Sequence, residues 1–170
     1  MNPEQTISFR VYKNGQRLLG VATVDMPELE FLTETLSGSG IAGEYDSPTL
    51  GMTGSMSSKL SWVSQTPQFY ALMNSGDPMF ELYASVQQRD QTTSKRKPVG
   101  LHIVLTGDVK KSSLGTLETG KKHGNETEIE VLRLEADIDG EQVLLIDKLN
   151  MIFSVNGEDV LEAVRAQLGE

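Results

Sequence analysis

Two histidines are the first candidates for chemistry, because the sequence contains no cysteine. The absence of cysteine excludes thiolate catalysis, disulfides and cysteine-based zinc or iron–sulfur sites. His102 lies in an alternating apolar segment and His123 lies in a polar stretch, so we interpret both as structural or solvated side chains. The Gly-x-Ser-x-Gly motif of a hydrolase nucleophile does not occur. We therefore expect no catalytic residue and no metal ligands, and we expect that the protein is not an enzyme.

Gly38, Gly40 and Gly43 match the Gly-x-Gly-x-x-Gly pattern of a dinucleotide-binding turn. Such a turn leads into an apolar helix, whereas here the polar sequence Glu44-Tyr45-Asp46-Ser47-Pro48 follows. We therefore expect no dinucleotide and no other cofactor. The segment 37–54 contains five glycines and one proline and is predicted to be a long loop that is either functional or disordered.

The charge of the chain limits the partners that it can bind. Its 170 residues carry 24 acidic and 15 basic side chains, which gives a formal charge of −9. This charge argues against a protein that binds nucleic acid or an anionic membrane by neutralising phosphates. The first residues form neither a basic nor an apolar leader, and no apolar run approaches the ~20 residues of a membrane span. We expect a chain that folds in a reducing cytosol without a membrane anchor.

Alternation of apolar and polar residues predicts a mainly β protein. The hairpin signals Asn14-Gly15 and Asp139-Gly140 indicate antiparallel pairing. The sequence predicts one domain over 1–170, an antiparallel sandwich or barrel with one or two short flanking helices and with long loops at about 37–54 and 110–125. The expected strands cover 7–11, 18–24, 28–36, 56–62, 80–86, 101–105, 132–138 and 143–149, and the expected helices cover 66–73 and 158–168.

Several faces of these elements need a partner. The C-terminal helix carries an apolar stripe that is expected to pack inward, formed by Val160, Leu161, Val164 and Leu168. Polar residues line one side of the strands expected over 28–36 and 56–62, and they either face solvent or line a wet interior between several copies. Three basic clusters, at 95–97, 110–111 and 121–122, are interpreted as solvated loop ends or as contacts with an acidic neighbour.

Five stretches of the sequence, in order along the chain, resemble a known family. These are Leu19-Gly20-Val21 to Pro27-Glu28-Leu29, Ser37 to Gly43, Gly115-Thr116-Leu117 with Gly120, Ile138 to Asn150, and Val155 to Leu161 with Val164-Arg165 and Leu168-Gly169. Together they are similar to the major tail tube proteins of contractile-tailed bacteriophages, the P2-like FII family, which is related to the R-type pyocin tube. The loops at 88–98 and 110–125 match poorly.

The resemblance implies a structural subunit of the virion tail, assembled in the bacterial host cytoplasm. Six copies would form a ring in which strands of each copy join one closed β-barrel, and stacked rings would form a tube for DNA delivery. The partners implied are other copies of the chain, the sheath, tape-measure, baseplate and tail terminator proteins. DNA would pass through the lumen without specific binding.

This resemblance suggests roles for two sets of residues. Candidates for the channel wall are Glu28, Glu30, Glu34, Ser57, Lys59 and Glu81, because an acidic wall repels phosphates. Among these Lys59 has the opposite sign and is available to pair with a neighbouring carboxylate. Candidates for stacking onto the adjacent ring are Gly38, Gly40, Gly43, Glu44, Tyr45, Pro48 and Leu50, because glycine permits close backbone approach.

Two alternative functions remain open at this point. The chain could be the tube subunit of a pyocin-like or type VI-like injection particle, which would share the same fold and assembly. It could also be a small β-sandwich that binds a ligand or catalyses a reaction, which would require converging titratable groups that the sequence does not supply.

Overall fold

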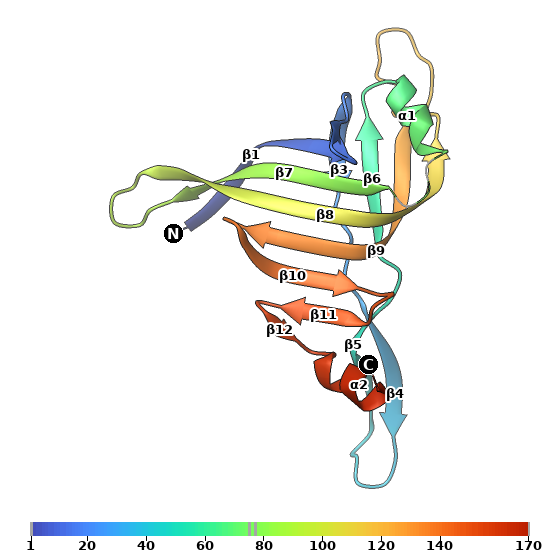
Figure 1. Cartoon of the computed structure of the whole chain (residues 1–170), viewed down its shortest axis with the longest axis vertical. Helices are drawn as coiled ribbons and strands as arrows, with labels where there is room; N and C mark the ends of the chain where they lie inside the picture. Colours follow the sequence, from blue (N-terminus) through green and yellow to red (C-terminus); the bar gives the residue numbers. More distant parts are fainter. Residues whose placement is uncertain (1, 75, 77, 170) are drawn as a thin grey trace.

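The computed structural model describes residues 2–74, 76 and 78–169. Within these ranges ten strands form one antiparallel sheet, two further strands form a separate antiparallel arm, and two short helices flank them (Figure 1). The expected mainly β, antiparallel fold class is confirmed. The elements are β1 (Asn2–Lys13), β2 (Gln16–Arg17), β3 (Val21–Asp25), β4 (Phe31–Ser37), β5 (Glu44–Thr53), β6 (Ser57–Trp62), α1 (Pro67–Leu72), β7 (Met79–Arg89), β8 (Arg96–Ser113), β9 (Glu126–Ile138), β10 (Glu141–Asp147), β11 (Ile152–Val155), β12 (Glu158–Asp159) and α2 (Glu162–Leu168).

The sheet forks at β9. Its main order is β12-β11-β10-β9-β8-β7-β1-β2. β8 follows β9 along the whole of one edge, from the pair Leu101 and Ile138 to the pair Ser113 and Glu126. Along the other edge, β6 pairs with 126–130 of β9 and β10 pairs with 133–138. β3 extends the β6 branch.

A bend in β8 and β9 makes this fork possible. Both strands turn sharply in Figure 1. The register of their pairing shifts between Thr106 and Gly107. A side chain at Gly107 would overlap the backbone carbonyl of Glu130, so the close approach of the two strands requires glycine. The bend directs the two halves of β9 toward different neighbours and folds the sheet around its apolar side.

The hydrophobic core fills the inside of this bend. α1 covers it, and Thr66 caps that helix by accepting a hydrogen bond from the backbone N–H of Phe69 at 3.2 Å. The predicted helix over 66–73 is therefore confirmed as α1. The buried members of the core are Val11, Leu18, Met56, Leu60, Trp62, Phe69, Leu72, Phe80, Leu82, Leu105, Ile129, Val131, Leu134, Ile146, Phe153 and Leu161.

The segment predicted as a loop over 37–54 is mostly strand. β4 and β5 pair from Ser37 and Glu44 at the tip to Phe31 and Thr53 at the base, which leaves only 38–43 as a turn. Pro48 is tolerated in β5 because the arm has just two strands and one edge of each is open. The strand predicted over 28–36 begins later, at Phe31, and its residues are exposed. We call β4, β5 and their turn the arm.

Other boundaries also differ from the sequence prediction: in place of the strand predicted over 18–24 the chain forms β2 and β3, and β9 begins at Glu126 and not at 132. β8 continues to Ser113, so the loop predicted over 110–125 covers 114–125. The C-terminal helix begins at Glu162, and not at 158, because Glu158 and Asp159 pair with β11 as β12. The Asp159 carboxylate accepts a hydrogen bond from the backbone N–H of Leu161 at 3.0 Å and thereby fixes the turn before the helix. In the described part of the chain, no helix has the length and apolar character needed to cross a membrane.

Candidate functional site

β9 has two chemically different sides. Its inward side carries buried Thr127, Ile129, Val131 and Leu134, which face the core. Its outward side carries Glu126, Glu128, Glu130, Arg133, Glu135 and Asp137. A bulge near Leu132 shifts the alternation by one residue but keeps the charged residues on the outward side.

Neighbouring strands extend this polar surface. Cross-strand pairing places His102 beside Asp137, Asp147 beside Arg133, and Lys59 beside Glu128. We call this surface the acidic face, and it comprises Lys59, Glu81, His102, Asp108, Lys110, Lys111, Glu126, Glu128, Glu130, Arg133, Glu135, Asp137 and Asp147. Eight carboxylates on it oppose four residues that are always cationic at neutral pH.

Lys110 joins two carboxylates at one end of the acidic face. Its ammonium group lies 3.3 Å from Glu128 and 3.1 Å from Glu130. The hydrogen bond to Glu130, together with Glu128, raises the pKa of Lys110. Hydrogen bonds from Ser57 and Lys110 lower the pKa of Glu128, so both partners are charged at neutral pH.

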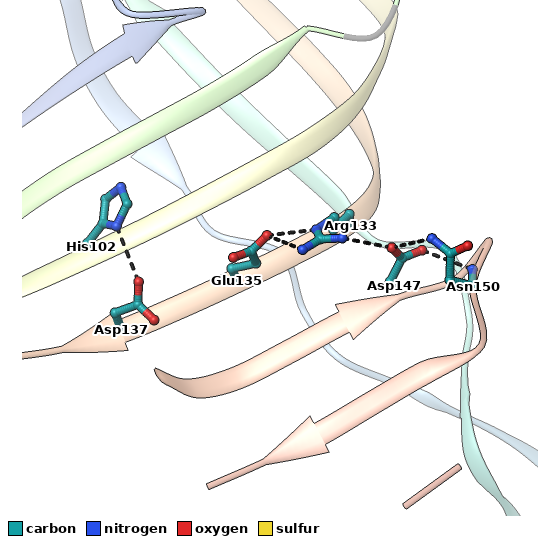
Figure 2. Close-up of polar contacts among 6 residues, drawn as sticks. All are labelled: His102, Arg133, Glu135, Asp137, Asp147 and Asn150. Atoms are coloured by element: carbon teal, nitrogen blue, oxygen red, sulfur yellow. Dashed lines mark hydrogen bonds and ion pairs between the residues drawn. The ribbon is translucent and has the colours of Figure 1, made fainter. Parts of the chain in front are cut away.

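Arg133 links two carboxylates across β9 and β10 (Figure 2). Its guanidinium lies 2.6 Å from Glu135 and 3.1 Å from Asp147, and Asp147 is only 5% exposed. Burial disfavours the ionised form of Asp147, but hydrogen bonds from Asn150 and the charge of Arg133 outweigh burial, and the pKa of Asp147 is lowered. The network therefore holds Asp147 and Arg133 in their charged forms.

His102 lies between two carboxylates at the other end of the acidic face. Its Nδ1 is 3.3 Å from Asp137 and its Nε2 is 3.5 Å from Glu81 (Figure 2 shows the Asp137 contact). The imidazole stacks on the Tyr83 ring at 4.4 Å between centroids. Tyr83 donates a hydrogen bond of 2.8 Å to Glu81, which raises the pKa of the Tyr83 phenol. Across the described residues, no His, Asp and Glu side chains converge in a way that could hold a metal ion.

The comparison with known protein families gives these surfaces a context. The family model for phage tail tube protein FII matches residues 3–169. The chain belongs to the phage tail tube protein FII family. The tail tube protein of Escherichia phage P2 is 27% identical over 177 residues, which cover 98% of this chain and 98% of that protein. The resemblance found in the sequence is therefore confirmed.

Membership of the tail tube family decides between the broad classes of function. The chain is a structural component of a phage tail, it is not an enzyme, and its location is the virion tail. Tail tube proteins assemble with copies of themselves into a tube and associate with other tail components. The alternative of a small ligand-binding or catalytic sandwich is thereby set aside.

Five of the six channel candidates lie on or beside the acidic face of this tail tube chain. Lys59 and Glu81 belong to it, and Lys59 pairs with Glu126 at 3.6 Å. Glu28, Glu30 and Ser57 line an open hollow next to Lys59. Glu34 is on the arm, opposite Ser47, and does not join the others.

The arm contains all the residues predicted to stack rings in the tail tube. Gly38, Gly40 and Gly43 form its turn with positive φ angles, a conformation that favours glycine. Glu44, Tyr45, Pro48 and Leu50 are exposed on β5 instead of lying in a loop. Tyr45 pairs with Leu36 of β4, and these side chains are 51% and 39% exposed. The arm therefore presents apolar groups that its own chain does not cover.

The base of the arm is anchored on the body of the tail tube subunit. The ring of Phe31 packs on Phe153 at 5.5 Å between centroids, and Lys148 donates a hydrogen bond of 2.6 Å to the carbonyl of Gly54. Gly51 lies against the buried side chain of Leu161. The predicted packing of the C-terminal helix is thus only partly observed, since Leu161 and Val164 contact the core but Val160 is 37% and Leu168 64% exposed.

The acidic face also contains residues that the sequence reasoning missed. Glu126, Glu128 and Glu130 alternate with Thr127, Ile129 and Val131, the signal of a strand with one wet side. The prediction began this strand at 132 and therefore overlooked that signal. For the cationic partner Lys110 the sequence predicts a loop, and for Asp147 it predicts a strand without a functional role.

Proposed function

We propose that this chain is the subunit of the inner tube of a contractile phage tail. Six copies form a ring whose sheets join into one closed barrel, rings stack into a tube, and DNA passes through the channel at ejection. The proposed partners are other copies of the chain, the sheath, tape-measure, baseplate and tail terminator proteins. The proposed site of assembly is the host cytoplasm.

The acidic face is the observation that carries this proposal. It lies on the side of the sheet opposite the core, and its carboxylates outnumber its cations. Lys59, Lys110 and Arg133 are each held by a carboxylate of the same face, and Lys111 lies opposite Glu128 across the strand pair. A phosphate that approaches such a surface meets net repulsion, because binding a polyanion requires available Lys and Arg side chains. A channel with this lining would let DNA slide without adhering.

Open strand edges support a barrel that closes between subunits. Within the described residues, β1 pairs with β7 along one edge, whereas β2 covers its other edge only at Tyr12 and Lys13. An uncovered edge carries backbone N–H and C=O groups that favour pairing with another strand. Closure of the sheets of several copies into a barrel would cover these groups.

The arm supports stacking of one ring on the next. A two-stranded hairpin without other support is marginally stable in water. Leu36 and Tyr45 would gain burial if the arm lay against a neighbouring subunit. We propose this contact for the arm, including Gly38, Gly40, Gly43 and Leu50.

Electron microscopy of concentrated wild-type protein tests the proposal. We expect rings or tubes with a central channel, and particles that stay monomeric at high concentration would contradict it.

Tubes of the variant Glu126→Lys/Asp137→Lys are expected to retain duplex DNA that wild-type tubes do not bind. The control Glu141→Lys/Glu162→Lys changes the net charge by the same amount at positions away from the acidic face. If its tubes also retained DNA, the net charge of the subunit, and not the charge of the acidic face, would determine DNA retention.

A further inference from the structure

The arm and the segment that leads into it carry only negative charge. The chain has no Lys or Arg between Arg17 and Lys59. Five exposed carboxylates lie in or just before the arm, at Glu28, Glu30, Glu34, Glu44 and Asp46. Across the described residues, no ion pair involves any of these five, in contrast to the carboxylates of the acidic face.

The turn between β7 and β8 carries the opposite charge. Lys95 ends this turn, Arg96 and Lys97 begin β8, and all three side chains are exposed. In the part of the chain that the structure describes, Lys95 and Lys97 have no carboxylate within ion-pair distance. The nearby acids already have partners, since Arg89 donates a 2.6 Å hydrogen bond to Glu4, and the backbone N–H groups of 92 and 93 bind the Asp90 carboxylate. We call 95–97 the basic turn.

These two charged elements cannot meet within one chain. In Figure 1 the arm extends below the sheet, whereas the turn between β7 and β8 projects to one side of it. The body of the sheet separates them, and screening at physiological salt weakens attraction beyond ~8 Å. An attraction between them therefore has to act between different copies.

We propose that the arm of one copy docks against the basic turn of another copy. This inference rests on the proposed self-assembly and adds the surface that each arm recognises. The occupant is a second copy because this chain itself supplies both complementary surfaces. Glu44 and Asp46 lie at the outer part of β5, the part of the arm most accessible to a neighbour, and Lys95 and Lys97 would face them.

Apolar and charged groups would have different roles in this contact. Leu36 and Tyr45 sit on the side of the arm opposite Asp46, because side chains alternate along a strand. Burial of these two side chains would supply most of the affinity, whereas the charges would orient the arm and speed the encounter. The contact should therefore weaken as salt is raised but should not vanish.

Charge exchange between the two surfaces tests the inference. One variant, Glu44→Lys/Asp46→Lys, makes the arm basic like the turn, and the other, Lys95→Glu/Lys97→Glu, makes the turn acidic like the arm. All four side chains are exposed, so circular dichroism and thermal unfolding should match those of wild-type monomer. We expect each variant alone to form tubes only at an about tenfold higher protein concentration, which corresponds to a loss of roughly 1.4 kcal/mol of binding free energy per contact. Light scattering and electron microscopy measure this concentration.

Restoration is the decisive result. In a mixture of the two variants, each arm meets an oppositely charged turn on the other variant, so tubes should form near the wild-type concentration. The chain that carries all four substitutions should behave likewise. The control Lys121→Glu/Lys122→Glu changes the net charge as much in another loop and should assemble normally.

Two outcomes would overturn the inference. Variants that assemble like wild type would show that the arm does not need the basic turn, and a mixture that fails to assemble would show that these substitutions disturb different contacts. Either result leaves wild-type tubes intact and so leaves the proposed function standing. Wild-type protein that forms no tubes at all would contradict the proposed function and, with it, this contact.

Discussion

The backbone of Gly107 passes against the carbonyl group of Glu130 with no room for a side chain between them. This contact lies at the bend of β8 and β9, beside the register shift that follows Thr106. Because the bend sends the two halves of β9 toward β6 and β10, one glycine determines how the acidic face is curved and how the core is enclosed.

Replacement of this glycine should therefore be costly. We expect Gly107→Ala to lower the free energy of unfolding by at least about 2 kcal/mol, because the added methyl group forces two backbones apart. Gly100→Ala is the matched control, since a Cβ at Gly100 of the same strand meets no atom within 4 Å. Thermal unfolding of both variants measures the difference. Equal melting temperatures would show that the strands separate without cost.

Asp147 should make the stability of the protein depend on pH. Its pKa is lower in the folded state than in the unfolded state, so its stabilising effect is complete above pH ~4 and is lost as the pH falls through the folded-state pKa. We expect Asp147→Asn to cost about 2 kcal/mol at pH 7, because an amide cannot accept all the hydrogen bonds from Arg133, 149 and 150.

Denaturant unfolding between pH 2 and 7 measures this effect. The Asp147→Asn variant should lose less stability than wild type below pH 4, because it has no carboxylate to protonate there. The control is Asp139→Asn, at an exposed turn position with φ 55°, which asparagine adopts readily. Parallel pH curves for wild type and Asp147→Asn would rule out a role for this carboxylate.

The single tryptophan reports on a buried polar contact. The indole N–H of Trp62 donates a hydrogen bond of 3.1 Å to the hydroxyl of Thr127, and both residues are buried. Thr127→Val keeps the shape but leaves the indole N–H without an acceptor, which should cost about 1–3 kcal/mol. Thr127→Ser retains the acceptor and should recover the hydrogen bond. Fluorescence-monitored unfolding distinguishes them, and a Val variant as stable as the Ser variant would contradict the prediction.

Some elements of this fold are specified by residues close together in the chain. The alternation in β7 and the capping pair Thr66-Pro67 predicted their elements well, because both depend on residues adjacent in the chain. The sequence pattern does not predict β5, because Gly51 and Pro48 within it are poor strand formers. They are tolerated because the arm pairs at one edge of each strand and lies outside the main sheet.

The candidate site was predictable only in part for the same reason. The polar character of Lys59 and Glu81 was visible in their strands, and so was the need of Lys59 for a carboxylate. That the carboxylate belongs to Glu126 depends on the pairing of β6 with β9, which joins residues far apart in the chain. Glu34 has the same local alternation as Glu30, yet pairing places it on the arm.

The sequence by itself determined the mainly β class, the negative charge, the absence of cysteine chemistry and the resemblance to a tail tube family. The first three properties follow from residue types and short-range periodicity, whereas the resemblance rests on five short stretches that lie in the order of the family. The tertiary structure alone decided which carboxylates share a face, which cations they hold and where the arm and the basic turn project. Strand pairing sets these relationships, and pairing joins distant segments whose register local sequence does not specify.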